Sequence, residues 1–274
     1  MKNISLLLLV ALWPMNLVQA ADSLVVYSGR SDKFVKPVAM AFTQKTGIKV
    51  ILHAGSSTAL LNKLQLEGKR TSADLYISND AGNLQKGSDL KLFRSLPKSI
   101  YRNIPSNYRS TNNDWLGLSA RARVLVVNKN AALGKGLNSV FDLASPKYKG
   151  QIGITHSGNE SYIAGVTVYM QSKGKEFTQN WLNGMKNNLN DGVFNKHSKI
   201  VKAVAKGKKT VGLVNHYYIY RYLAKHPQAP VRIVVPDQGK GQIGVAWNVA
   251  GAAVVKHSTK AELAEKFMAF MVSI

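Results

Sequence analysis

Short apolar runs alternate with amphipathic segments near the start of the chain, and this alternation restricts the fold more than any other feature. Three runs are typical of buried strands, at residues 24–28, 48–52 and 73–78. Between them, apolar side chains recur at helical spacing, at residues 32–46 and 57–67. The order strand, helix, strand, helix, strand predicts a doubly wound parallel sheet, whose ligands bind beside the carboxyl ends of the strands.

A second unit with the same alternation follows. Strands are predicted in the remainder of the chain at residues 122–128, 152–154, 211–215, 231–235 and 251–255. Helices are predicted there at residues 161–171, 176–187, 198–206 and 260–272, with one more opening at Tyr217. We expect Ser198 to cap the helix that begins there.

These two units predict two α/β lobes with a ligand cleft between them. We expect the chain to cross to the second lobe near Ala122 and to return near Val249. Residues 21–122 and 249–274 would then form the first lobe, and residues 123–248 the second.

Residues 1–20 are predicted to be a secretory signal. Lys2 precedes an apolar run at residues 4–18, and small side chains at Val18 and Ala20 indicate cleavage after Ala20. A membrane anchor is the alternative. Polar residues interrupt the run before it reaches the roughly 20 apolar residues that a span needs, so we favour export.

The composition excludes several classes of site. The chain has no cysteine, which excludes disulfides, thiolate metal sites and a cysteine nucleophile.

Lysine and arginine number 37 against 14 aspartate and glutamate residues, for a net charge of +23. Such a balance can mark nucleic-acid or anionic-membrane contact. The lysines are spread along the chain, however, and the densest cluster is Lys199, Lys202, Lys206, Lys208 and Lys209. Without a DNA-binding motif or interleaved aromatic residues, we expect a cationic surface and no nucleic-acid partner.

We do not expect an enzyme. The sequence contains no Gly-x-Ser-x-Gly, no His-Glu-x-x-His and no phosphate-loop motif. Its six histidines are scattered along the chain.

Seven segments resemble the periplasmic ferric-ion-binding proteins, the type II, transferrin-like carriers of ferric-iron ABC importers. The segments are YSGR at 27–30, AFTQKTGIKV at 41–50, SADLYIS at 72–78, WLGLSARARVLVVN at 115–128, LASPKYKGQIGI at 143–154, VNHYYIYR at 214–221 and PDQGKGQIGVAWNVAGAAVVK at 236–256. They cover nearly the whole exported chain in order.

The resemblance implies a type II periplasmic binding protein fold with two lobes, a hinge and an interlobe cleft. It implies a periplasmic monomer that carries ferric iron, Fe(3+), to the permease of an ABC importer in the inner membrane. Members of the family continue beyond the position of Ile274. The resemblance therefore implies that the family's C-terminal elements are missing from this sequence.

In that family a pair of tyrosines after an asparagine-containing strand binds iron, and the pair falls on Tyr217 and Tyr218. The chemistry is suitable, because ferric iron is a hard cation that prefers oxygen anions. A phenol has an ordinary pKa near 10, but a bound trivalent ion favours the phenolate. The alternative from the pattern alone is ordinary aromatic packing.

The first lobe departs from the family at both places where a ligand is expected. Ser31 and Asp32 stand where several members carry histidine, and Asn79 stands where a carboxylate often follows the third strand. Asp32 or the neighbouring Asp80 would be substitute oxygen ligands. Both aspartates are equally compatible with helix capping or a solvated loop.

The second lobe keeps more of the family pattern. Tyr162 or Glu160 is a candidate third ligand, because the family tyrosine aligns with Ser161. Other positions match residues that hold the anion or support the tyrosines. They are Ser157, Gly158, Asn159, His197, Asn215, Arg121, Arg123 and Arg221. The first three would offer backbone N–H groups at a helix N-terminus, and the arginines would favour phenolates or remain surface charges.

With so few first-lobe ligands, we expect an anion or chelator to complete the iron site, with carbonate, phosphate or citrate as candidates. The alternative function is the same fold carrying a small organic or phosphorylated anion.

Overall fold

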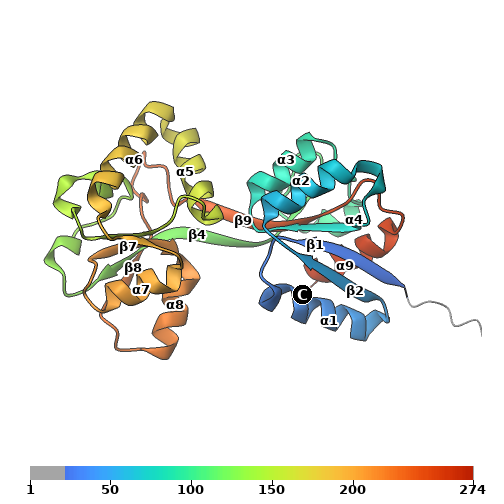
Figure 1. Ribbon diagram of the computed structural model, residues 1–274, viewed down its shortest axis with the longest axis horizontal. Coiled ribbons are helices and arrows are strands. Elements are labelled where there is room, and N and C mark those ends of the chain that lie inside the picture. The colour runs from blue at the N-terminus through green and yellow to red at the C-terminus, as the bar shows by residue number, and fades with distance from the viewer. Residues whose placement is uncertain (1–21, 274) are drawn as a thin grey trace, which may run out of the picture.

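The computed structural model describes residues 22–273, so the predicted signal at residues 1–20 lies outside the described part. Two α/β lobes lie side by side, joined by the long strands β4 (Leu116–Asn128) and β9 (Trp247–Val254) (Figure 1). Within residues 22–273, every helix is too short or too polar to cross a membrane.

The first lobe is a sheet with helices on both faces. Its strands β1 (Ser23–Ser28), β2 (Lys49–Ala54) and β3 (Leu75–Ser78) are parallel, and β9 joins them antiparallel in the order β2-β1-β3-β9. Helices α1 (Asp32–Thr46) and α9 (Ala261–Val272) pack on one face, with the short α4 (Lys98–Tyr101). Helices α2 (Ser57–Glu67) and α3 (Ala81–Asp89) pack on the other.

The second lobe repeats this layering. Strands β7 (Val211–Asn215), β5 (Ile152–Thr155) and β6 (Val193–Phe194) extend the sheet from β4, and β8 (Val231–Val234) also pairs with β4. Helices α5 (Glu160–Lys173) and α6 (Lys175–Leu189) cover one face, and α7 (His197–Ala205) and α8 (His216–Lys225) cover the other. Short 3-10 turns occupy Gly68–Arg70, Ser106–Tyr108, Ala132–Gly134, Phe141–Ala144 and Pro146–Tyr148.

Strand β4 changes partner in the middle. Its first half pairs with β9, from Leu116 opposite Ala252 to Ala122 opposite Trp247. From Arg123 onward it pairs with β7, beginning opposite Asn215. The crossing between the lobes therefore lies at residues 121–123, and the arginines at both ends of this triplet lie at the hinge.

Strand β9 starts at Trp247 rather than Gly251, and the short β6 and α4 were not predicted. Three further differences have a physical explanation. Strand β4 starts at Leu116 rather than Ala122, because polar residues in its first half conceal the apolar pattern. Helix α3 was not predicted, since its glycines and few apolar residues give little helical signal. The predicted cap at Ser198 is wrong, because α7 begins at His197 and Lys196 precedes it without a side-chain cap.

Helix α9 is held to the first lobe by a fully buried aromatic contact. The Phe267 ring lies 4.8 Å from the Phe42 ring of α1, and Phe267 has 0% exposure. We expect Phe267→Ala to lower the free energy of unfolding by about 3–5 kcal/mol, because it removes a large core side chain and leaves a cavity. Chemical denaturation measures this. The exposed neighbour Lys266→Ala should change it by no more than about 0.5 kcal/mol, and equal effects would contradict the packing role.

Candidate functional site

The hinge and three helix starts meet in the second lobe. Helix α5 follows β5, α8 follows β7, and α7 begins beside them. Asn215, the last residue of β7, accepts a hydrogen bond from Arg123 Nη1 at 3.2 Å and donates one to Ser161 Oγ of α5 at 3.1 Å. Each helix start carries partial positive charge from its unpaired N–H groups. The region is therefore electropositive before any side-chain charge is counted.

Tyr217 and Tyr218 are the second and third residues of α8, immediately after β7. Their ring centroids lie 4.4 Å apart, and both side chains are only half-buried. Burial raises the pKa of the Tyr218 phenol, and the Tyr217 phenol adds to this effect. Adjacent phenols at one helix start form a pair of neighbouring oxygen donors.

Arg123 is the most deeply buried charge among the described residues. Its side chain has 0% exposure, and Nε and Nη2 have no hydrogen-bond partner. Burial lowers the pKa of this guanidinium to about 10, so it stays charged near neutral pH. A buried charge without an anionic partner is costly. Arg123 is therefore placed to meet a negative ligand or phenolate.

Arg121 and Arg30 extend this positive charge into the cleft. Arg121 is 5% exposed, and its Nη2 lacks a partner. Burial lowers its pKa, whereas nearby Tyr217 and Asp80 act in the opposite direction. Arg30 comes from the loop after β1 in the first lobe, and burial and the Arg121 charge lower its pKa. Both lobes thus contribute cations to one region.

His197 lies against the tyrosine pair. Its ring centroid is 5.0 Å from that of Tyr218, and neither ring nitrogen has a hydrogen-bond partner. Burial lowers the pKa of His197 to about 3, with Arg123 and Arg121 adding to the effect. The imidazole is therefore neutral. It can donate one hydrogen bond to a bound group and accept one from it.

Glu160 connects the two lobes. Its carboxylate, on the first residue of α5, accepts hydrogen bonds from the Ser57 N–H and from Asn79 Nδ2, both at 3.2 Å. Ser57 packs directly against the backbone of Gly29, after β1. Any side chain at Gly29 would clash, because a Cβ there would lie only 2.3 Å from Ser57 Oγ. The Glu160 carboxylate is thus bound to the first lobe rather than directed at the tyrosines.

A second contact between the lobes joins helix α8 of the second lobe to helix α1 of the first. The Arg221 guanidinium of α8 lies 5.1 Å from the Tyr217 ring and 5.4 Å from the Phe34 ring of α1. Arg30 covers the same Phe34 ring at 4.7 Å. Between the lobes, a cavity of about 240 Å³ is lined by Asp80, Glu160, Trp247 and Asn248, among others.

The two first-lobe aspartates occupy local structural positions. Asp32 forms a 2.8 Å ion pair with Lys36 on α1, and Ser31 precedes that helix as its N-cap residue. Asp80 caps α3, because its carboxylate accepts from the Asn83 N–H at 2.8 Å. The ion pair therefore gives Asp32 a local role on α1, and capping gives Asp80 one on α3.

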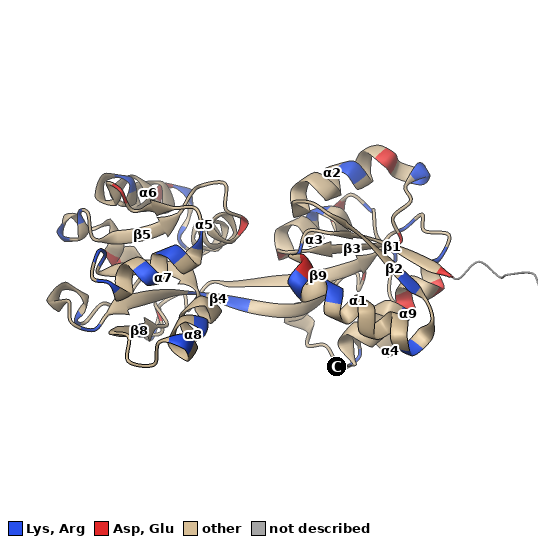
Figure 2. Ribbon diagram, turned by 60° about the horizontal axis from the view of Figure 1, so that its bottom comes forward, with Lys and Arg blue, Asp and Glu red and all other residues tan. Residues whose placement is uncertain are grey.

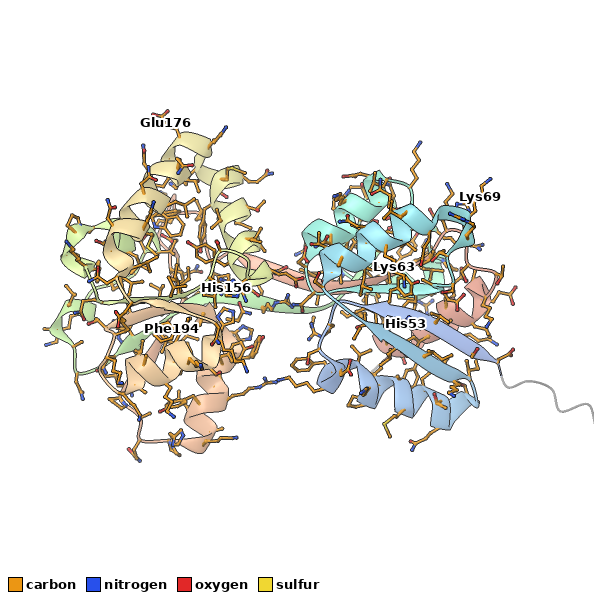
Figure 3. All side chains as sticks on the ribbon, viewed as in Figure 1. His53, Lys63, Lys69, His156, Glu176 and Phe194 are labelled. Carbon is orange, nitrogen blue, oxygen red and sulfur yellow. The ribbon has the colours of Figure 1, made fainter. Side chains whose placement is uncertain are left out.

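The loop between β5 and α5 lies beside the site, but some of its hydrogen-bonding groups already have partners within the protein. Asn159 caps α5 by accepting from the Tyr162 N–H, and its own N–H donates to His156 O. Ser157 and Gly158 lie in the same loop, and Figure 3 shows His156 on the side that faces the first lobe. Tyr162 is buried in the second-lobe core, where burial raises its pKa.

Two buried or half-buried residues at the site were not anticipated. Arg30 follows β1 in the YSGR segment, where its position at a strand end was the available signal. Asn248 is 3% exposed and has an unpartnered Nδ2, but nothing in its sequence context marks it.

In residues 22–273 no group of three or more histidine, aspartate or glutamate side chains could hold a metal. Any metal at this site would depend on tyrosine oxygens.

Known structures share this arrangement of lobes. The iron-bound HitA from Pseudomonas aeruginosa superposes with a TM-score of 0.82 at 28% identity, covering 92% of this chain and 81% of that one. The IdiA (FutA) of Trichodesmium, solved with iron and citrate, has a TM-score of 0.78 at 30% identity, covering 91% and 81%. The predicted two-lobed fold is confirmed by these likenesses.

Curated relatives align over most of the chain. Iron uptake protein A1 of Synechocystis is 31% identical over 90% of this chain and 70% of its own length. The major ferric iron-binding protein of Neisseria meningitidis is 30% identical over 93% of this chain and 77% of its own length. A family described as bacterial extracellular solute-binding protein matches residues 38–273. The chain belongs to this family of bacterial extracellular solute-binding proteins.

Proposed function

We propose that this protein captures ferric iron outside the cytoplasm, together with an anion, and delivers it to the permease of an ABC importer. The observation that carries the proposal is the pair of half-buried phenols, Tyr217 and Tyr218, beside buried arginines with unpartnered nitrogens. The relatives named for iron uptake and ferric iron binding support it. Because the protein binds and releases its cargo, no catalytic residue is assigned.

The charge of the site indicates how iron enters. Arg123 and Arg121 are buried at the hinge, and three helix starts add partial positive charge. A bare trivalent cation would be repelled by this environment. Two phenolates offset only part of the charge, so the ion is expected to arrive with a multiply charged anion or chelator. Oxygen donors on that anion would also fill coordination positions for which the first lobe offers few ligands.

The unpartnered nitrogens indicate where the anion binds. Arg123 Nε and Nη2, Arg121 Nη2 and the ring nitrogens of His197 all lack partners, and all lie near the tyrosine pair. An anion here would accept charge-assisted hydrogen bonds while coordinating the iron. Carbonate, phosphate and citrate have suitable oxygen donors. We assign the anion to these groups and the iron to the phenols, with Arg221 supporting the phenolate of Tyr217.

A second candidate function uses the same groups without iron. The unpartnered arginine nitrogens would also suit a small organic or phosphorylated anion bound alone. The two functions differ in colour. A phenolate bound to ferric iron has a visible charge-transfer absorption, whereas an organic anion bound alone leaves the protein colourless.

Removal of one phenol tests the iron assignment. We expect Tyr217→Phe or Tyr218→Phe to abolish or strongly reduce the charge-transfer band and to weaken ferric iron binding by roughly 100-fold or more, since each removes an anionic ligand. Titration with ferric citrate, followed by absorption, measures both effects. Tyr220→Phe is the matched control on the same helix, because that ring is 57% exposed. Equal spectra for all three variants would contradict the assignment.

Anion dependence tests the charge argument. We expect apparent ferric iron affinity to rise by about tenfold or more when citrate, phosphate or carbonate is added, a gain of ~1.4 kcal/mol. Arg121→Gln should lose most of this gain, because it removes a buried cation near the pair. The exposed Arg102→Gln of the first lobe should retain it. Equal affinity in every buffer would reject the requirement for an anion.

Glu160 offers a test of closure. We propose that its hydrogen bonds to Ser57 and Asn79 hold the lobes together. Glu160→Ala should enlarge the radius of gyration of the iron-free protein in solution scattering. It should also weaken iron binding by about tenfold, as expected for loss of charged hydrogen bonds worth ~1.5 kcal/mol.

The control is Glu176→Ala, which removes an exposed glutamate at the far tip of α6 (Figure 3). It should change neither quantity. If Glu160→Ala alters the charge-transfer band but not the radius of gyration, Glu160 would be an iron ligand and not a closing contact.

A further inference from the structure

One continuous part of the second lobe is strongly basic. Residues 192–236 contain no aspartate or glutamate. Their basic side chains are Lys196, Lys199, Lys202, Lys206, Lys208, Lys209, Arg221, Lys225 and Arg232. This stretch forms β6, α7, β7, α8 and β8, so it builds one side of the lobe rather than a tail. Figure 2 shows the basic positions along α7 and α8.

Helix α7 carries three of the exposed lysines of this stretch in a single stripe. Its buried face consists of Ile200, Val201 and Val204, among others, which pack into the second-lobe core. Lys199, Lys202 and Lys206 are all exposed, and their spacing of three and four residues places them on one helical face. Lys196 and Lys208 are exposed at the two ends. We call these five lysines the α7 lysine face.

Lys209 does not belong to this face. It is 4% exposed, donates a hydrogen bond to Gly150 O at 2.8 Å and pairs with Asp191. The other ion pairs found in residues 22–273 involve Lys36 and Lys63 of the first lobe. In the part of the chain that the structure describes, the α7 lysine face therefore has no carboxylate partner.

The chemistry of the face distinguishes between possible partners. Protein interfaces are depleted in lysine and enriched in arginine and aromatic residues. Proteins that bind single-stranded nucleic acids add aromatic rings for stacking. Helix α7 has neither arginine nor an exposed aromatic or large apolar side chain within its described residues. Compact ammonium groups on flexible stems fit a diffuse layer of anionic headgroups, which attracts each nearby lysine without needing shape complementarity.

We propose that the α7 lysine face adsorbs the carrier to an anionic phospholipid surface. Adsorption would confine it near a bilayer, where the permease of the proposed importer resides, and would convert a three-dimensional search into a lateral one. The attraction is electrostatic and falls off within about 10 Å at 0.1 M salt. An attraction of this kind lets the protein bind to the lipid surface and leave it rapidly. None of these five lysines is among the groups assigned to iron or its anion, so adsorption does not require bound iron.

Vesicle sedimentation with the exported, purified protein tests the proposal. The wild-type protein should bind vesicles of phosphatidylglycerol and phosphatidylethanolamine at low salt, lose binding at high salt, and fail to bind phosphatidylcholine vesicles. The triple variant Lys199→Gln, Lys202→Gln and Lys206→Gln should partition roughly 100-fold more weakly, as expected for about 1 kcal/mol per lysine near an anionic surface.

The matched control removes the same charge from the first lobe. Lys69→Gln, Lys86→Gln and Lys98→Gln together change three exposed lysines, of which Lys69 is labelled in Figure 3. This variant should bind within about threefold of wild type. Both triple variants should keep the wild-type iron titration and thermal midpoint, which separates this test from the iron proposal and from misfolding.

Three results would overturn the proposal. Equal losses in both triple variants would attribute adsorption to net charge alone. Absence of binding, or equal binding to phosphatidylcholine, would exclude an electrostatic lipid surface. Tighter binding to polyglutamate or to duplex DNA than to anionic vesicles at the same salt, lost in the α7 variant, would assign the face to an acidic protein or a nucleic acid instead.

Discussion

The burial of Arg123 without a carboxylate is the constraint on which the rest of the site depends. Its guanidinium has 0% exposure, and its one hydrogen bond goes to the neutral amide of Asn215. Leaving a charge in such a place costs several kcal/mol unless negative charge is supplied nearby. A bound anion would supply it, and a metal cation bound to that anion would take the neighbouring phenol oxygens as ligands. A ligand that brings both cation and anion therefore satisfies the arginine, the phenols and the helix starts together.

The same strand that carries this charge also connects the lobes. Arg121 and Arg123 occupy the point where β4 exchanges β9 for β7. A rotation of the lobes about this crossing would keep both arginines close to its axis. The groups farther from the axis differ between the lobes: Arg30 and Asn79 come from the first, Glu160 and Arg221 from the second. Binding at the hinge and closing over the ligand would then use different groups, in a fold type for which hinge closure around a ligand is a common motion.

Much of the fold was predictable because periodicity is local. Alternating strands and helices revealed both lobes, and the tyrosine pair could be placed at the start of α8 from the strand before it. The contacts that define the cleft are not local. Glu160 and Ser57 are separated by 103 positions, and only the crossing of β4 brings them together. Conversely, Asp32 and Asp80 both follow a strand, where a carboxylate suits metal coordination, a helix cap or an ion pair. The ion pair of Asp32 with Lys36 and the cap that Asp80 forms with the Asn83 N–H become visible only in the structure.

The asymmetry of the site bears on release as well as capture. The second lobe holds the phenols, Arg123 and His197, and Arg121 lies at the hinge. The first lobe offers the half-buried Arg30, the Phe34 ring and two hydrogen-bond donors to Glu160. A carrier with strong ligands on both lobes must break metal bonds to open. Here opening breaks two hydrogen bonds and a cation–ring contact, each worth on the order of 1 kcal/mol. If a permease separates the lobes, the iron would remain on the second lobe, exposed on one side and held chiefly by two phenolates and its anion. Under the proposed function, exchange of that anion would then loosen the ion, for the same electrostatic reason that the anion would favour its entry.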